Sequence, residues 1–169
     1  MAGQHVVGAL ALAVAVLMTA MAARPAAGGA TLKVEIVHVT RAAEPHIPLT
    51  LVEPVATDLG VQGAHLGLSD NATTGRFLDH HYTLKEVTIP KDGSLAQTMQ
   101  PVLAGGAQLI AADLRADDLL TLARMDAAQG ALILNARSRQ DRLRTRECRA
   151  NVLHIAESNA MLADGIGQY

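Results

Sequence analysis

The stretch AQLIAADLRADDLLTLARMDAAQGALILNARS, residues 107–138, holds two short apolar runs separated by an amphipathic segment. The runs, Leu109–Ala112 and Ala131–Leu134, are too short for helices and are typical of strands buried on both faces of a sheet. Two such strands joined by a helix run parallel, with a right-handed crossover between them. This unit therefore predicts a parallel α/β sheet.

The segment between the two runs predicts the connecting helix. Asp117 and Asp118 fall in its first turn, where carboxylates suit the positive end of the helix dipole. Gly130 is placed to end the helix. Between these points the apolar residues follow one another at helical spacing: Leu119, Leu122, Ala123 and Ala127.

The rest of the chain repeats this alternation of strand and helix. A Val- and Ile-rich strand is predicted over Thr31–Thr40, followed by a Pro-containing loop over residues 41–54. A helix interrupted by glycines (58–71) and a turn with the sequence NATTG (71–75) come next. The remaining predicted elements are a strand at Tyr82–Ile89, a helix from an N-cap at Ser94 to Leu103, a strand at Val152–Ile155 and a helix from an N-cap at Ser158 to Tyr169. This order predicts an open, mostly parallel, doubly wound α/β sheet.

The N-terminal residues are expected to stand outside this fold. Val6–Met18 is a continuous apolar run, and Ala20-Met21-Ala22 after it fits a signal-peptidase site. We therefore interpret residues 1–27 as a secretory signal peptide with a short linker, cleaved after Ala22 or near Ala27, which predicts a periplasmic protein. The segment before the run lacks Lys and Arg, so an apolar N-terminal helix is the alternative.

Composition excludes several classes of protein. The 169-residue chain has a formal net charge of −2, so nothing global indicates a nucleic-acid or anionic-membrane partner. With no Trp, two Tyr and one Phe it has little surface on which bases could stack. Its single cysteine, Cys148, excludes a disulfide scaffold or zinc ribbon, and we expect an inert, half-buried thiol.

Enzyme motifs are absent, because the chain lacks GxGxxG after its first strand, a P-loop lysine, GxSxG and HExxH. We interpret Gly60, Gly63 and Gly67 as sites of close packing or a kink. The run Asp79-His80-His81, with Asp70 nearby, is interpreted as a solvated loop in preference to a metal site, because adjacent histidines point in different directions. Two further histidines, His38 and His154, are expected to be satisfied core residues. We therefore predict a protein that is not an enzyme.

The candidate ligand site lies where the central strands end, since ligands of open parallel sheets bind beyond the carboxyl ends of the strands. Six candidate residues follow the two runs: Asp113, Leu114, Asn135, Ala136, Arg137 and Ser138. A run of arginines begins at Arg137 and continues to Arg149, and guanidinium groups suit carboxylates, which predicts an anionic ligand. The alternatives are helix capping and a solvated loop with ion pairs in the neighbourhoods of Arg139–Asp141 and Arg146–Glu147.

Two longer segments resemble a known family. Residues 63–78, GAHLGLSDNATTGRFL, and residues 148–169, CRANVLHIAESNAMLADGIGQY, resemble type I periplasmic substrate-binding proteins of ABC transporters. They are most similar to a subfamily associated with alcohol oxidation that depends on pyrroloquinoline quinone (PQQ).

The resemblance implies an N-terminal lobe over residues 31–156 and, over 157–169, the first helix of a second lobe that this sequence lacks. It implies a truncated binding protein with no resident cofactor. The expected ligand is small and polar, and the resemblance leaves PQQ, an alcohol-derived metabolite and a metal chelate open. The expected partner is an ABC transporter permease. A flavodoxin-like regulatory or enzymatic domain and a non-functional fragment remain alternatives.

Overall fold

The computed structural model describes residues 31–44, 58 and 60–168. The predicted signal peptide and most of the predicted loop over 41–54 lie outside these residues. Within the described part five strands form one sheet: β1 (Leu32–Arg41), β2 (His80–Ile89), β3 (Leu109–Asp113), β4 (Leu132–Asn135) and β5 (Val152–His154). All neighbouring pairs are parallel, and the spatial order is β2-β1-β3-β4-β5.

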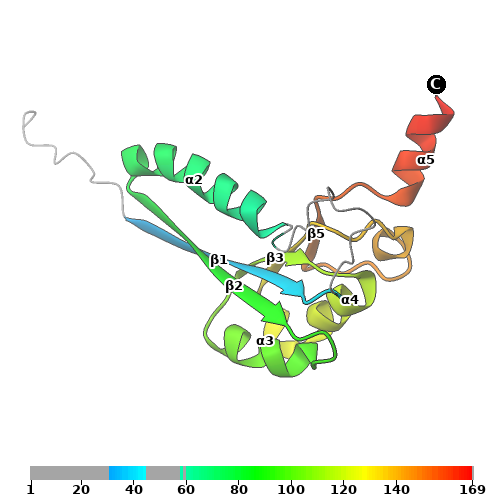
Figure 1. Cartoon of the computed structure of the whole chain (residues 1–169), viewed down its shortest axis with the longest axis horizontal. Helices are drawn as coiled ribbons and strands as arrows, with labels where there is room; N and C mark the ends of the chain where they lie inside the picture. Colours follow the sequence, from blue (N-terminus) through cyan, green and yellow to red (C-terminus); the bar gives the residue numbers. More distant parts are fainter. Residues whose placement is uncertain (1–30, 45–57, 59, 169) are drawn as a thin grey trace, which may run out of the picture. The chain divides into compact units, whose positions relative to one another are not determined.

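Helices follow β1, β2, β3 and β5, as predicted. They are α2 (Val61–Leu78), α3 (Leu95–Ala104), α4 (Ala116–Arg124) and α5 (Asn159–Gly167). Figure 1 shows α2 on one side of the sheet, with α3 and α4 on the other. The α/β class with an all-parallel sheet is therefore confirmed.

The core lies between the sheet and the α3–α4 layer. Successive side chains of a strand point to opposite faces, and one set of alternate residues faces this layer. Val37, Val39, Ile110, Ala112 and Ile133 are fully buried there. They pack with α3 and α4 through Met99, Leu103, Leu119, Leu122 and Ala123.

The other face of β4 and β5 is less covered than predicted. Leu132, Leu153 and Ile155 are 42%, 55% and 63% exposed. Burial on both faces was therefore a wrong expectation for the run Ala131–Leu134, whereas every residue of Leu109–Ala112 is buried or half-buried. The physical reason is that α2 packs along β2, at one side of the sheet, and no other described helix lies over β4 and β5 on this face.

The predicted turn at Asn71–Gly75 is instead part of one continuous helix, α2. Its turn-forming side chains bond back to helix carbonyls: Asn71 Nδ2 donates to Gly67 O at 2.7 Å, and Thr73 Oγ1 donates to Asp70 O at 2.7 Å. Such bonds let these residues sit inside a helix. The helix ends at Asp79, which adopts the left-handed conformation, and β2 begins at once with His80, earlier than predicted.

The helix after β3 is shorter than predicted. It ends at Arg124, where Met125 turns extended, and a short 3₁₀ turn, η1 (Asp126–Ala128), follows. Gln129 Nε2 donates to the Ala123 carbonyl at 3.0 Å and so satisfies one of the last helix carbonyls. Ala127, predicted on the apolar face, is consequently exposed.

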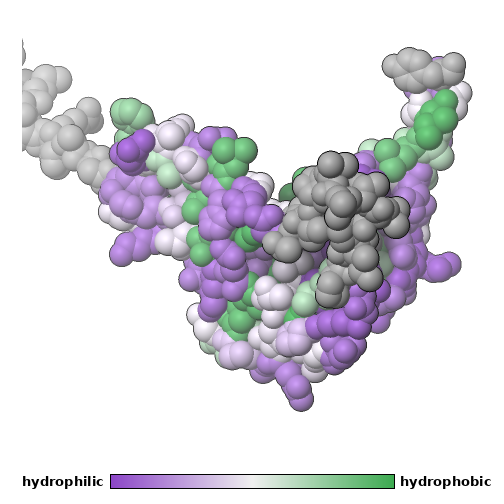
Figure 2. Space-filling model, in the orientation of Figure 1, coloured by the Kyte–Doolittle hydropathy of each residue, from purple (hydrophilic) through white to green (hydrophobic). Residues whose placement is uncertain are grey.

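Both predicted serine caps are confirmed. The Ser94 hydroxyl accepts from Gln97 N at 3.3 Å, and the Ser158 hydroxyl accepts from Met161 N at 3.1 Å. Ser158 is buried, yet α5 behind it has no buried residue. Figure 2 shows apolar surface on this helix, to which Met161, Leu162 and Ile166 contribute.

Candidate functional site

The predicted site residues lie at the carboxyl edge of the sheet, the edge at which the five parallel strands end. Asp113 closes β3, and Arg137 follows β4, the neighbouring strand. Arg137 Nη1 is 3.6 Å from Asp113 Oδ1, a loose ion pair in which the arginine side chain is 51% exposed. The structure thus brings together two of the six candidates as accessible charged groups.

Three other candidates, Leu114, Asn135 and Ser138, are buried. Leu114 belongs to the hydrophobic core. Asn135 is also fully buried: its Nδ2 donates to Ser138 O at 2.7 Å, and its Oδ1 accepts from Ser138 N at 2.8 Å. These two bonds close the turn after β4, so the amide of Asn135 is used by the fold. The sixth candidate, Ala136, is exposed, and its N–H bonds to Ala112 O at 3.1 Å.

The start of α2 approaches Asp113 closely. Gly60 has a φ of +89°, and a Cβ there would lie 2.9 Å from Asp113 Oδ2 and 3.7 Å from His38 Nε2. His38 is buried at the sheet surface, as predicted. The close-packing interpretation therefore holds for Gly60 alone, because a Cβ at Gly63 or Gly67 would meet no atom within 4 Å.

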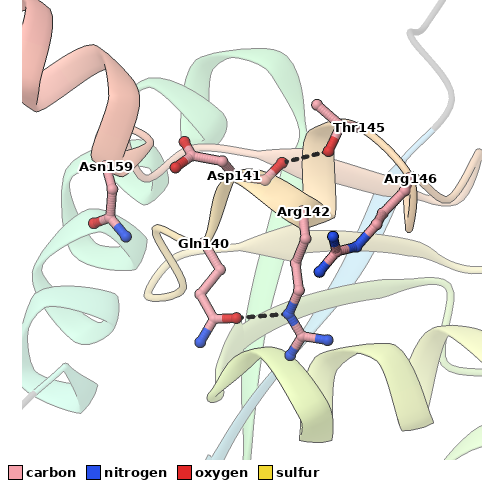
Figure 3. Close-up of a pocket in the computed structure, with 6 residues that line it drawn as sticks. All are labelled: Gln140, Asp141, Arg142, Thr145, Arg146 and Asn159. Carbon is pink, nitrogen blue, oxygen red and sulfur yellow. Dashed lines mark hydrogen bonds between the residues drawn. The ribbon is translucent and has the colours of Figure 1, made fainter.

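A cavity of about 380 Å³ opens beside this edge, and we call it the carboxyl-edge cavity. Its walls come from the segment after β4, including the 3₁₀ helix η2 (Asp141–Arg144), and from the start of α5. Figure 3 shows its lining: Gln140, Asp141, Arg142, Thr145, Arg146 and Asn159.

The two cavity arginines differ in their partners. Arg142 is neutralised twice: Nη2 lies 2.5 Å from Asp117 Oδ1, and Nη1 lies 2.6 Å from Glu147 Oε2. These acids raise the pKa of Arg142, the Asp117 bond most. Arg146 is exposed, and no carboxylate among the described residues pairs with it. In Figure 3 both side chains extend to the same side of the η2 turn. Of the two arginines in the lining, Arg146 is therefore the one that has no carboxylate partner among the described residues.

The acid in the lining, Asp141, is hydrogen-bonded to the backbone at the start of α5. Its Oδ1 accepts from Ala160 N at 3.0 Å, and this backbone bond lowers the pKa of Asp141, with help from the Ser158 hydroxyl. Asn159 N donates to Arg139 O at 2.9 Å and ties the same two segments. The start of α5 is therefore fixed to the η2 segment.

The amides in the lining provide donors for a ligand. Gln140 uses its oxygen to accept from Arg142 Nε at 2.6 Å, so its NH₂ group is the part left for another acceptor. The Asn159 amide stands across the cavity at the start of α5 (Figure 3). Guanidinium and amide donors around one space suit a carboxylate or phosphate.

The sequence did not predict Gln140, Thr145 or Asn159 as ligand residues, and it placed Arg146 in a run of arginines and in an ion-pair neighbourhood with Glu147. Its two local ion pairs are also replaced. Arg139 pairs with Glu157 at 2.7 Å, and Glu147 pairs with Arg142. The η2 turn directs these side chains to partners that are not adjacent in sequence.

Other sequence candidates contribute no metal centre in the described part of the chain, where no cluster of three or more ligating side chains occurs. His81 Nε2 lies 3.2 Å from Asp79 Oδ1, and His80 Nδ1 lies 3.3 Å from the Tyr82 hydroxyl, so the two histidines have separate partners. Cys148 is exposed, which corrects the expectation of a half-buried thiol. It stands in the turn before β5, outside the apolar packing.

Comparison with protein families, with curated proteins and with solved structures gave no match. Among the helices of the described residues, none has the length and apolar character needed to cross a bilayer.

Proposed function

We propose that this chain is a solute-binding lobe that captures a small anionic ligand in the carboxyl-edge cavity. The observation that carries the proposal is Arg146, a guanidinium in a cavity of about 380 Å³ with no carboxylate partner among the described residues. Three carboxylates of the neighbouring segments already have other partners, since Asp117 and Glu147 hold Arg142 and Asp141 holds the α5 backbone. An anionic ligand would complete this electrostatic arrangement.

The architecture supports the same proposal. An all-parallel sheet places its ligand beyond the carboxyl ends of the strands, which is where this cavity lies. The exposed Arg137 stands at the same edge, outside the cavity lining, where its loose pair with Asp113 leaves the guanidinium accessible to an incoming anion. Leu114, Asn135 and Ser138 then serve the site indirectly, by holding its backbone.

Together with the resemblance of residues 63–78 and 148–169, these features favour a periplasmic substrate-binding component of an ABC transporter over an enzyme. On this proposal the N-terminal apolar run exports the protein, and a transporter permease receives the ligand. PQQ is the first ligand to test, because it is a tricarboxylate and the resemblance points to PQQ-dependent alcohol catabolism. An alcohol-derived carboxylate is the second.

The test is a thermal melt of the purified chain with PQQ and with small carboxylates. A ligand at about 100 times its Kd adds roughly 2.7 kcal/mol to the stability of the native state, which is a Tm shift of several degrees. Arg146→Gln should weaken binding by about tenfold or more, and Arg137→Ala tests the second arginine in the same way. A Tm that no anion shifts would refute the proposal.

A flavodoxin-like domain is the second candidate, because the strand order β2-β1-β3-β4-β5 is also that of flavodoxin-like folds. In such folds the ligand binds where β1 and β3 diverge, which here is the edge that carries His38 and Asp113. Titration with flavin mononucleotide separates the two candidates: flavin binding that Asp113→Asn abolishes and Arg146→Gln leaves intact would favour this one.

A further inference from the structure

A second cavity, of about 510 Å³, lies at the opposite edge of the sheet, where β4 and β5 begin. We call it the amino-edge cavity. It is lined by the turn that leads into β4 and by the turn that leads into β5, through Gln129, Leu132, Cys148, Arg149 and Asn151 among others. Its volume falls in the range of small-molecule sites.

Arg149 is the charged residue of this lining, and no carboxylate among the described residues forms an ion pair with it. Arg149 is partly buried, and its Nε is buried without a hydrogen-bond acceptor among the described residues. The nearest acid along the chain, Glu147, is held by Arg142 at 2.6 Å and by Arg124 at 3.9 Å. A partly buried guanidinium without an anion is electrostatically unfavourable, so an anion in the cavity would be stabilised.

The side-chain amides of Asn151 and Gln129 indicate which polar group the ligand would carry besides its anionic group. Asn151 Nδ2 donates to the carbonyls of Ala123 and Ala128, at 3.3 and 3.1 Å, and Gln129 Nε2 donates to Ala123 O and Met125 O, at 3.0 and 3.3 Å. With both NH₂ groups bound to backbone, the amide oxygens are the groups left to receive a donor. Leu132, 42% exposed, adds an apolar wall.

We propose that the amino-edge cavity binds a small aliphatic hydroxycarboxylate. Its carboxylate meets Arg149, its hydroxyl donates to an amide oxygen of Gln129 or Asn151, and its short carbon chain lies against Leu132. An amino group in place of the hydroxyl would bring a positive charge beside Arg149, which favours the hydroxy acid. This site is independent of the carboxyl-edge cavity.

Chemical modification of Cys148 can report on occupancy of this site, because Cys148 lines the cavity, is exposed and is the single cysteine of the chain. The rate at which the neutral reagent N-ethylmaleimide modifies Cys148 is measured with 3-hydroxybutyrate, with butyrate and with sodium phosphate, all at equal ionic strength. At about ten times its Kd a ligand occupies about nine-tenths of the sites, so 3-hydroxybutyrate should slow modification about tenfold. Butyrate should protect less, and phosphate least.

Arg149→Gln should remove the protection, whereas Arg146→Gln, at the other cavity, should leave it intact. Circular dichroism checks that each variant is folded, and Arg149→Lys, which keeps the charge but loses the planar fork, should protect weakly. The proposal is overturned if 3-hydroxybutyrate does not protect the wild-type chain, if phosphate protects equally well, or if protection survives in a folded Arg149→Gln chain.

Discussion

Asp118 and Arg41, 77 positions apart in the sequence, form a two-point ion pair in which Arg41 Nε and Nη2 each donate to one carboxylate oxygen at 2.8 Å. The remaining nitrogen, Nη1, donates to three carbonyls of the turn after β2, those of Pro90, Lys91 and Gly93. One guanidinium therefore joins the end of β1, the β2–α3 turn and the first turn of α4. The bond to Arg41 is the main reason that the pKa of Asp118 is lowered.

Asp118→Asn should destabilise the chain by about 1–3 kcal/mol, because both side chains are only 16% exposed and Arg41 would lose its counter-charge. The matched control is Asp117→Asn, one position earlier. Asp117 is 89% exposed in its pair with Arg142, so this change should cost less than about 1 kcal/mol. Urea denaturation at neutral pH measures both, and equal losses would contradict the prediction.

This pair also marks the limit of sequence reasoning. Asp117 and Asp118 were correctly placed in the first turn of a helix, and the helix dipole was a sufficient reason for both. Nothing local distinguishes the two residues. Only the parallel pairing of β1 with β3, with α4 following β3, brings Arg41 to Asp118.

The elements themselves were predictable where periodicity and capping agree. Ser94 and Ser158 cap helices because each precedes a helical pattern, and that signal is local. The prediction failed where a local signal competed with helix bonding, as in the NATTG segment at residues 71–75. There Asn71 and Thr73 bond within the helix and do not break it.

The sequence predicted at which edge of the sheet the candidate site lies, but it did not predict the residues that line the cavity. The rule for parallel sheets located Asp113 and Arg137 at the carboxyl ends of their strands. The lining of the cavity depends on how η2 turns and on where Asp141 anchors α5, and both are set by contacts across the sequence. The run of arginines was the available signal for Arg146.

Two glycines of α2 should respond oppositely to alanine. A Cβ at Gly75 would lie 2.8 Å from His80 O and 2.9 Å from Tyr82 Cε2, which is closer than real Cβ atoms approach backbone. Gly75→Ala should therefore destabilise the chain by about 1–3 kcal/mol. Gly67→Ala, with nothing within 4 Å, should stabilise it by up to about 1 kcal/mol through helix propensity. Thermal melts measure the Tm of both variants. A Gly75→Ala chain that melts at or above the wild-type Tm would show that packing at Gly75 is not limiting, and a lowered Tm in Gly67→Ala would contradict the propensity argument.

Asn135 should prove essential to the fold whatever it does for a ligand. Asn135→Ala leaves the buried N–H and C=O of Ser138 without their partners, so we expect a loss of about 2–4 kcal/mol in the free energy of unfolding. Ala136→Ser, at the exposed neighbouring position, is the control and should be neutral. If Asn135→Ala melts like the wild-type chain, the turn after β4 does not depend on this amide.

His154 is coupled to the same turn. Asn135 Nδ2 lies 2.9 Å from His154 Nδ1, and because Nδ2 is a donor, this contact favours a neutral imidazole whose Nδ1 accepts. His154 is only partly buried, and its Nε2 has no hydrogen-bond partner among the described residues, which corrects the expectation of a satisfied core histidine. Burial is the main cause that lowers the pKa of His154, and the charge of Arg144 adds to it. Protonation of Nδ1 would replace a hydrogen bond by two opposed donors next to the buried Asn135 amide.

The chain should consequently lose stability as the pH falls below about 6.5. In the unfolded chain His154 titrates near 6.5, and in the native chain it titrates lower, so between these two pKa values the unfolded state binds more protons. The contribution is fully present above about pH 6.5 and falls by at most about 1.4 kcal/mol per pH unit down to the native pKa. His154→Asn should flatten this part of the profile of unfolding free energy against pH, measured with urea from pH 7.5 to 5. His65→Asn, at an exposed histidine paired with Glu86, should leave the His154 contribution in place. A profile that keeps its slope in His154→Asn would assign the acid sensitivity to another group.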